Sequence, residues 1–282
     1  MFDSGVGGLT VLHECLVSLP EEDFLYLGDT ARFPYGERSP DELLRFARQL
    51  AAVLIERGAK LLVVACNSAT AAALPALREE LHGRTPVIGV VTPEARLAAR
   101  ATRNGRVGLI ATPATVASGA YADAIAAIDP HVDLVAVPCP DLAPLIQDPP
   151  HRGGDHDPVF TDELLQAVRG YTAPLVEAGV DTVILGCTHY PLVRPMLQRM
   201  LGRGVTIVTS GAALARQVEH ALGSRDLATR RGGEGTYSFL CTGDVGAFRA
   251  LGTRFLQMPL TEVERVELAP QPTTEVPAWP RP

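Results

Sequence analysis

Lysine is almost missing from this chain: Lys60 is the single lysine among its 25 lysine and arginine residues. It precedes a predicted strand, whereas ligands of open α/β sheets bind beyond the opposite, carboxyl ends of the strands. A pyridoxal-phosphate enzyme needs a lysine in its site to hold the cofactor as a Schiff base. We therefore expect this protein to act without pyridoxal phosphate, and we predict no cofactor.

Other absences narrow the function further. No apolar run approaches the about 20 residues of a membrane span, and the chain opens directly on a glycine-rich loop, so we expect neither a membrane segment nor a signal peptide. The formal net charge is −7, which gives no basic face for nucleic acid. These features predict a cytoplasmic protein that acts on a small molecule.

Cysteines are few, and no two of them form a CxxC pair. An odd number of widely spaced cysteines disfavours a disulfide framework and fits a reducing compartment. Without a CxxC pair we predict no structural zinc site, and no metal at all. The cysteines are Cys15, Cys66, Cys139, Cys187 and Cys241.

Short apolar runs alternate with helical patterns along most of the 282 residues. Nearly continuous apolar strands are typical of a parallel sheet covered on both faces. The predicted strands are 24–27, 61–65, 87–90, 107–110, 134–137, 183–185, 205–208 and 237–240. The predicted helices are 40–56, 69–81, 116–128, 161–177, 191–201, 211–222 and 244–255. This alternation predicts an α/β fold.

Two of these strands each end on a cysteine within matching surroundings. Val63-Val64-Ala65-Cys66 follows a Glu-x-Gly element, and Ile184-Leu185-Gly186-Cys187 follows another in the same frame. The repeat predicts two similar domains related by a pseudo-two-fold, each with a mostly parallel sheet flanked by helices, around a central cleft.

We place the domain boundaries where the pattern breaks. Thr92-Pro93 interrupts it near residue 90, and a second break lies near residue 208. The first domain is thus predicted over 1–90 plus 208–260 and the second over 91–207. We interpret 149–158 as a polar loop. The Pro- and Glu-rich segment 261–282 predicts a disordered tail.

The repeated cysteines predict a site with two thiols. A single cysteine at a strand end is more often an inert core residue, but two at matched places in a repeat favour function. Helix N-termini should stabilise thiolates and attract carboxylates, so we expect a modest lowering of the thiol pKa values. Two facing thiols would form a two-sided acid/base pair.

Other motifs are less specific. Asp3-Ser4 begins a GxGG loop, which is either a plain strand-to-helix turn or a binding loop; it lacks the full GxGxxG pattern. The segment 28–36 after a strand is a second candidate loop. His189 is either a partner of Cys187 or a satisfied core histidine. Thr242-Gly243-Asp244 predicts a helix cap.

Four motifs together resemble the glutamate racemase family. They are Asp3-Ser4-Gly5-Val6-Gly7-Gly8, Gly28-Asp29-Thr30 with Pro34-Tyr35-Gly36, Ala65-Cys66-Asn67-Ser68, and Gly186-Cys187-Thr188-His189-Tyr190-Pro191. The resemblance runs from residue 2 to about 256. It implies cofactor-independent, two-base interconversion of L- and D-glutamate, with the D-glutamate feeding peptidoglycan synthesis.

The resemblance also implies roles for individual residues. Cys66 would exchange the α-proton on the D face and Cys187 on the L face. Asp3, Asp29 and His189 would assist the thiols. The substrate-binding residues would be Asp3, Ser4, Tyr35, Gly36, Asn67, Ser68, Thr188 and His189. Relatives dimerise in several ways, so a homodimer is one expectation and the sequence does not fix the oligomeric state.

The chain departs from the family pattern in places. Most of the family's first strand is missing before Phe2, so we expect Asp3 to be poorly anchored. Ser68 replaces the commoner Thr and keeps the hydroxyl. Gln147 stands where the family usually has Glu.

Three alternatives stay open at this stage. The first is an aspartate or hydantoin racemase of the same superfamily, although His189 after Thr188 favours glutamate. The second is a decarboxylase or isomerase on the same fold, whose relatives often keep only one cysteine. The third is a two-lobed solute-binding protein, which would need export.

Overall fold

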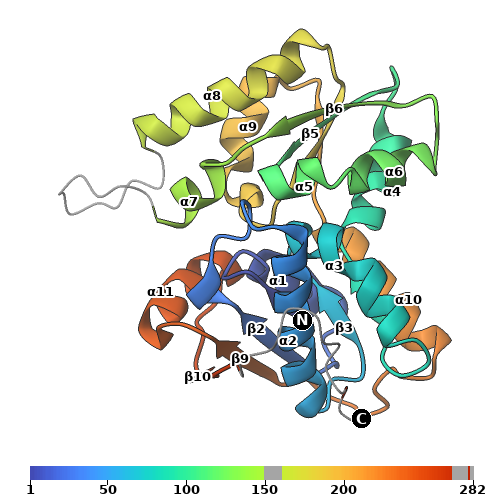
Figure 1. The fold of residues 1–282 in the computed structure, drawn as a ribbon, viewed down its shortest axis with the longest axis vertical. Coiled ribbons are helices and arrows are strands. Elements are labelled where there is room, and N and C mark those ends of the chain that lie inside the picture. Colours follow the sequence, from blue (N-terminus) through green and yellow to red (C-terminus); the bar gives the residue numbers. More distant parts are fainter. Residues whose placement is uncertain (149–160, 269–278, 280–282) are drawn as a thin grey trace.

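The elements of the computed structural model divide between two parallel sheets, each covered by helices (Figure 1). The model describes residues 1–148, 161–268 and 279. One sheet has six strands in the order β10-β9-β2-β1-β3-β4, and the other has four in the order β6-β5-β7-β8. Every strand pair in the described part of the chain is parallel, which confirms the predicted α/β class.

The strand bounds follow the predicted apolar runs closely. The larger sheet contains β1 (Phe2–Asp3), β2 (Phe24–Gly28), β3 (Leu62–Val64), β4 (Val87–Gly89), β9 (Tyr237–Cys241) and β10 (Val263–Arg265). The smaller sheet contains β5 (Arg106–Ala111), β6 (Asp133–Pro138), β7 (Thr182–Gly186) and β8 (Thr206–Val208).

The helices cover both sheets. The start of α2 is marked clearly in the sequence. α2 has proline at its start and a capping box in which Ser39 and Glu42 bond each other's backbone N–H groups. The helices are α1 (Leu9–Ser18), α2 (Pro40–Glu56), α3 (Asn67–Glu80), α4 (Val91–Ala101), α5 (Pro113–Ala117), α6 (Ala120–Ala126), α7 (Leu142–Gln147), α8 (Asp162–Glu177), α9 (Arg194–Leu201), α10 (Gly211–Ser224) and α11 (Val245–Leu256), with short 3₁₀ turns η1 (Thr30–Arg32) and η2 (Tyr190–Val193).

The repeated sequence folds into a repeated structure. Cys66 lies just beyond β3 of the larger sheet, and Cys187 lies just beyond β7 of the smaller one. The helices before these strands end alike, at Gly58 with φ +87° and Gly179 with φ +64°. Glycine adopts this left-handed conformation at little cost, so the Glu-x-Gly element terminates the helix in both units.

Several predicted boundaries are wrong. Thr92 and Pro93 do not break the pattern but lie in the first turn of α4, where a missing N–H donor is tolerated. The helix predicted over 116–128 is two helices, because Gly119 turns the chain with φ +70°. The helices α1, α4 and α7 were not predicted.

The start of the predicted disordered tail is also wrong. β10 pairs with β9 over residues 263–265, and Val266 is buried. Residues 269–278 and 280–282, as well as the predicted loop over 149–158, lie outside the described residues. The domain boundaries near 90 and 208 stay predictions; α10, which follows the second boundary, packs on α1 beside the larger sheet.

The short strand β1 is held firmly on both sides. Leu27 N donates to the carbonyl of Met1 at 3.0 Å, and Ala65 N donates to that of Phe2 at 2.9 Å. Asp29 N donates to the carbonyl of Asp3 at 3.0 Å. The expectation that Asp3 is poorly anchored is therefore wrong.

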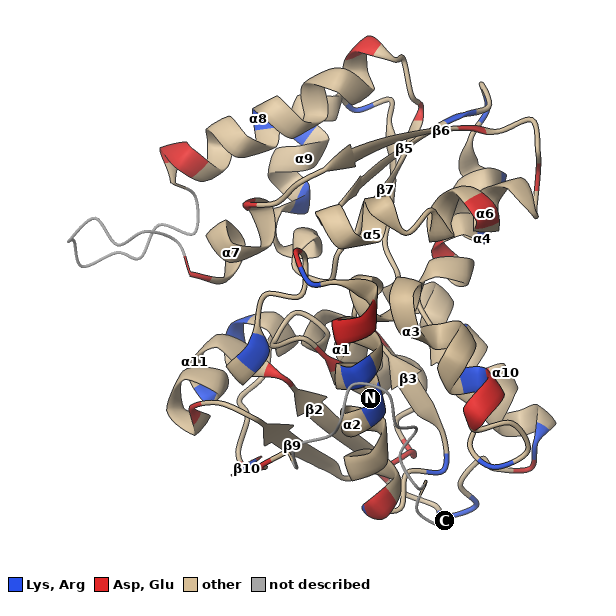
Figure 2. Ribbon diagram, in the orientation of Figure 1, with Lys and Arg blue, Asp and Glu red and all other residues tan. Residues whose placement is uncertain are grey.

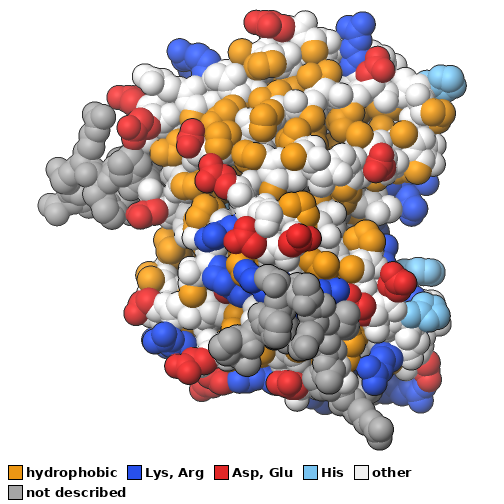
Figure 3. All heavy atoms as spheres, viewed as in Figure 1, with side chains coloured by type: hydrophobic (Ala, Val, Ile, Leu, Met, Phe, Trp, Pro, Cys, Tyr) orange, Lys and Arg blue, Asp and Glu red, His pale blue; other side chains and the backbone are white. Residues whose placement is uncertain are grey.

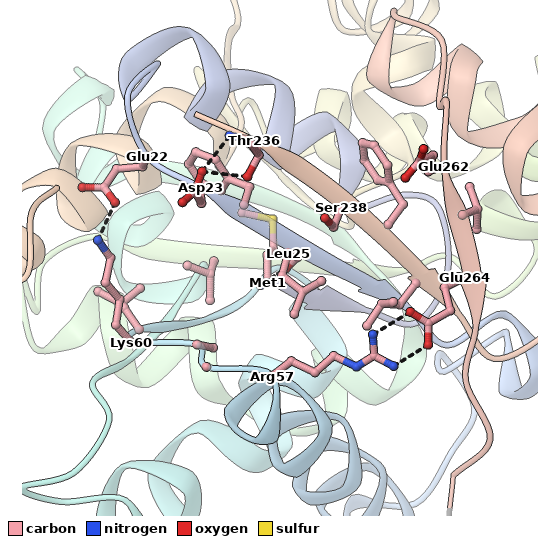
Figure 4. Close-up of a pocket in the computed structure, with 18 of the residues that line it drawn as sticks. Met1, Glu22, Asp23, Leu25, Arg57, Lys60, Thr236, Ser238, Glu262 and Glu264 are labelled. Carbon is pink, nitrogen blue, oxygen red and sulfur yellow. Dashed lines mark hydrogen bonds and ion pairs between the residues drawn. The ribbon is translucent and has the colours of Figure 1, made fainter. Parts of the chain in front are cut away.

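A cavity of about 1130 Å³ lies ahead of β1, beside β2 and the turn before β3 (Figure 4). The Met1 amine donates to the carbonyl of Leu25 at 2.7 Å, and burial lowers the pKa of this amine to about 5. The ion pairs Lys60–Glu22 and Arg57–Glu264 lie at its walls. None of the predicted site residues lines this cavity, so it is separate from the thiols.

Candidate active site

Both thiols line one small cavity between the two sheets. Cys66 is the N-cap residue of α3, and Cys187 follows β7. Because the carboxyl ends of parallel strands open toward ligands, each sheet delivers its thiol to the same place. Seven other predicted site residues line this cavity: Ser4, Tyr35, Gly36, Asn67, Ser68, Thr188 and His189.

The cavity is nearly closed. Its volume is about 30 Å³, roughly the space of one water molecule, whereas small-molecule sites usually measure about 300–1,000 Å³. The thiol side chains are buried, with residue exposures of 5% for Cys66 and 8% for Cys187. We therefore expect the walls to move apart when an amino acid binds between the thiols.

Burial controls the protonation of both thiols. Burial, together with the nearby Asp3 carboxylate, raises the pKa of Cys66 to about 12. Burial likewise raises the pKa of Cys187 well above its usual value. The N–H of Ala69 in α3 lowers the pKa of Cys66 but does not offset burial. The predicted lowering of the thiol pKa values is therefore wrong for this closed site, and each thiol needs a base.

Asp3 is a candidate base on the Cys66 side. Its fully buried carboxyl accepts hydrogen bonds from Gly5 N at 2.9 Å and Thr188 Oγ1 at 3.2 Å. Burial nevertheless raises the pKa of Asp3 to about 6. The Ser4 hydroxyl lies 3.5 Å from Asp3 Oδ1 and also interacts with the Cys66 thiol. A carboxyl with this pKa exchanges protons readily near neutral pH, so Ser4 can link it to Cys66.

His189 is the polar neighbour of Cys187. Its Nδ1 lies 3.9 Å from Cys187 Sγ, and its Nε2 lies 3.0 Å from Gln147 Oε1. Burial lowers the pKa of His189 to about 3, so the ring is neutral near neutral pH. An amide oxygen at Nε2 requires the proton on that nitrogen, which leaves Nδ1 as an acceptor facing the thiol. Gln147 thus takes over the orienting contact at a position where a carboxylate was expected.

Asp29 lies behind the cavity wall and not in it. Its carboxylate accepts from Arg32 Nε at 2.6 Å, from Thr242 Oγ1 at 2.7 Å and from the Tyr35 hydroxyl. The structure therefore places Asp29 where it orients Tyr35, a residue of the cavity wall. Its implied role beside a thiol stays a prediction. The predicted cap is formed by Asp244, which accepts from Ala247 N at 2.7 Å.

Sequence reasoning missed a hydroxyl cluster from the smaller sheet. Ser68 Oγ lies 2.8 Å from Thr112 Oγ1 and 3.1 Å from Thr115 Oγ1. Thr112 lines the cavity and caps α5 beyond the end of β5. A polar residue followed by proline directly after an apolar strand was the available signal. The cluster joins α3 to the second unit next to Cys66.

The described residues outside the cavity hold neither a cluster of metal ligands nor a membrane-spanning helix. Among the described residues no group of three or more His, Cys, Asp or Glu side chains is arranged to hold a metal ion. Acidic and basic residues are intermixed over the helices of both units (Figure 2). Across the described ranges, no helix combines the length and the apolar character that crossing a membrane requires.

The chain resembles known proteins over most of its length. Residues 12–218 match the protein family described as Asp/Glu/hydantoin racemase. The chain is 43% identical over 270 residues to a glutamate racemase of Geobacter metallireducens, covering 95% of this chain and 96% of that one. The chain belongs to the glutamate racemases of this family.

Solved racemase structures share the whole fold. A glutamate racemase isoform from Bacillus anthracis matches with a TM-score of 0.87 and 37% identity, covering 95% of this chain and 96% of that one. The glutamate racemase of Francisella tularensis, solved in complex with D-glutamate, matches with a TM-score of 0.84 and 31% identity over 94% and 95% of the two chains. The likeness to these racemases therefore extends over both sheets.

Proposed function

We propose that this racemase interconverts L-glutamate and D-glutamate without a cofactor, using Cys66 on the D face and Cys187 on the L face. The observation that carries the proposal is the single cavity lined by two thiols from different sheets. Racemisation removes the α-proton from one face and returns a proton to the other. Two bases on opposite sides of Cα perform this step, whereas one base cannot easily reach both faces.

The two thiols work in opposite protonation states during a turnover. Asp3 is linked to Cys66 through Ser4 and assists the thiol on that side, while Nδ1 of His189, 3.9 Å from Cys187 Sγ, orients the Cys187 thiol as a hydrogen-bond acceptor. The ammonium group of a bound amino acid also favours thiolate nearby. After each turnover the thiolate and the thiol have exchanged places, so the same site runs in both directions.

The carbanion-like state is stabilised by fixed donors. The first N–H groups of α3, directly after Cys66, have no partner within the helix and lie beside the cavity. Preorganised N–H donors stabilise developing negative charge because they need not reorient during the reaction. Ser4, Tyr35-Gly36, Asn67-Ser68 and Thr188-His189 hold the substrate around them.

Access requires the two units to separate. The first unit's loop contacts the second unit where Ala114 N donates to the carbonyl of Gly36 at 2.8 Å. The contact between Ser68 and Thr112 also crosses between the units. We propose that these contacts break when glutamate enters and re-form around it, which excludes water from the thiolate.

In the cell, the D-glutamate product feeds peptidoglycan synthesis in the cytoplasm. The five free cysteines suit a reducing compartment. We also propose a homodimer. Apolar side chains gather over the second unit on the face shown in Figure 3, and Val135 and Val137 of the edge strand β6 are only half-buried. Such a face is a candidate subunit interface.

The test is direct. Purified protein with a metal chelator and no added cofactor should convert L-glutamate to D-glutamate and the reverse, as followed by circular dichroism. The proposal is supported if the circular dichroism signal decays to zero from either enantiomer, because both reactions then end at the same racemic mixture. A protein that binds glutamate and leaves its configuration unchanged would contradict it.

A further inference from the structure

A buried carboxyl at the junction of the two units plays no part in the mechanism above. Glu94, in the first turn of α4, is fully buried, and no ion pair of the described residues includes it. Burial raises its pKa to about 8, against the hydrogen bonds that favour its charged form. Burying a carboxyl in this way costs folding free energy, which its hydrogen bonds must offset.

The group that Glu94 holds is next to a catalytic thiol. Asn67 Nδ2 donates to Glu94 Oε2 at 3.2 Å and to the Tyr121 hydroxyl at 2.7 Å. The Tyr121 hydroxyl in turn donates to Glu94 Oε2. Asn67 follows Cys66 in the chain and lines the cavity, while α4 and α6 carry the other two residues. The three helices α3, α4 and α6 meet at this junction (Figure 1).

This triangle leaves one oxygen of Asn67 without a partner. The amide NH₂ is used by Glu94 and Tyr121, and Asn67 Oδ1 is buried with no hydrogen-bond partner among the described residues. A buried carbonyl without a donor destabilises the empty site and favours a ligand that brings a donor. With the NH₂ held by acceptors, Asn67 offers that ligand an acceptor and not a donor.

We propose that Glu94 and Tyr121 are positioning residues that fix the amide orientation of Asn67, so that its carbonyl oxygen receives an N–H of the amino-acid substrate beside Cys66. The inference rests on the proposed function, because it assumes that glutamate binds in the cavity. It adds two residues of the second unit to the determinants of substrate binding. It also makes substrate binding depend on closure of the two units, because Glu94 and Tyr121 contact Asn67 from the second unit.

A double-mutant cycle tests whether the two residues act through Asn67. Glu94→Leu removes the acceptor and Tyr121→Phe removes the hydroxyl. Each should lower kcat/KM for glutamate about tenfold, the usual effect of one misplaced hydrogen bond, and mainly through KM. Asn67→Ala alone should raise KM. When Glu94→Leu or Tyr121→Phe is combined with Asn67→Ala, kcat/KM should change by less than about twofold relative to Asn67→Ala, because the side chain they orient is gone.

Matched variants separate positioning from stability. Glu94→Gln keeps a carbonyl acceptor and should retain KM within about threefold of wild type, as a rescue of Glu94→Leu. Tyr171→Phe removes another tyrosine hydroxyl that donates to a carboxylate, Asp141 at 3.3 Å, and should leave KM unchanged. If Glu94→Leu does not fold, Tyr121→Phe alone carries the cycle.

The outcomes distinguish the two proposals. The positioning role is overturned if Glu94→Leu or Tyr121→Phe keeps the wild-type KM. It is also overturned if either substitution causes the same tenfold loss in the Asn67→Ala background. The two-thiol mechanism stands in both cases. An inactive wild-type protein in the same assay instead overturns the proposed function. A loss of kcat at constant KM, with a lower melting temperature, assigns Glu94 to stability alone and also overturns the positioning role.

Discussion

At the scale of single residues, a different polar group lies near each of the two buried thiols. Cys66 is linked through Ser4 to Asp3, a carboxyl whose pKa is raised by burial. Cys187 faces His189, an imidazole that burial keeps neutral by lowering its pKa. The same burial that disfavours thiolate therefore also places the Asp3 pKa near neutrality and keeps an acceptor nitrogen free. The two halves of the site are alike in their strands and different in the polar groups beside their thiols.

The first prediction concerns the thiols. Cys66→Ser and Cys187→Ser should each remove nearly all interconversion, at least about 10³-fold in kcat, because serine is far less acidic than cysteine and one face then lacks its base. Each variant should still exchange the α-proton of one enantiomer with solvent, or eliminate from a suitable analogue, on its intact side. Circular dichroism and proton NMR measure the two activities. Wild-type racemisation in either variant would exclude the two-base mechanism.

The second prediction concerns pH. If Asp3 accepts the proton of Cys66, kcat/KM should fall about tenfold per pH unit below about 6, where Asp3 is protonated. Asp3→Asn should lose this acidic limb together with most of the activity. Asp3 also affects the free energy of unfolding. Because its pKa is raised in the folded protein, its contribution to stability is fully present below its unfolded pKa and is lost as pH rises through about 6. An acidic limb that is unchanged in Asp3→Asn would assign it to another group.

At the scale of elements, the sequence predicts what local pattern determines. The strands that carry Cys66 and Cys187 were predictable because each is a short apolar run behind a helix that ends on glycine. α4 was missed because Pro93 resembles a break, although proline is compatible with a first helical turn. β10 was missed because a three-residue strand has no period of its own and forms only by pairing with β9.

Other features depend on tertiary packing and had no local signal. The raised pKa values of the thiols result from burial between two sheets, which outweighs the helix N-terminus that the sequence shows. The contact between Asn67 and Glu94 joins α3, which packs on the larger sheet, to α4, which packs on the smaller one. Such contacts appear only once both sheets are in place.

The element-scale prediction concerns β1. An engineered segment of three or four apolar β-branched residues fused ahead of Met1 should continue β1 into the cavity beside Leu25 and Val63. It would add ladder hydrogen bonds and replace the buried amine, whose lowered pKa costs folding free energy as pH falls from about 8 toward 5. The melting temperature should rise by at least about 4 °C, since each kcal/mol is worth about 2–4 °C at this size.

The control for this prediction is a Gly-Ser segment of the same length. It also replaces the amine but has little preference for a strand and no side chains to fill the cavity. Equal melting temperatures for the apolar extension, the Gly-Ser extension and the original chain would show that the cavity does not accept a strand.

At the scale of the whole molecule, we expect specificity to follow from closure of the two units over one substrate. The closed cavity is small, so a ligand must meet donors from both sheets at once while its Cα lies between the thiols. Aspartate is one methylene shorter than glutamate and leaves donors at one end unpaired. We predict that kcat/KM for glutamate exceeds that for aspartate at least about 100-fold, or about 2.7 kcal/mol. Comparable values by circular dichroism would indicate a broad-specificity amino-acid racemase.

The most direct test of the two-thiol mechanism is the origin of the α-proton in the product. In D₂O, a short incubation with L-glutamate should give D-glutamate that carries deuterium at Cα, while the remaining L-glutamate is still protonated; the reverse reaction should behave in the same way. This pattern is expected because the proton is removed by one thiolate and replaced from the other thiol, which has equilibrated with solvent. Product that retains the original proton at Cα would show that a single base serves both faces, and would contradict the account.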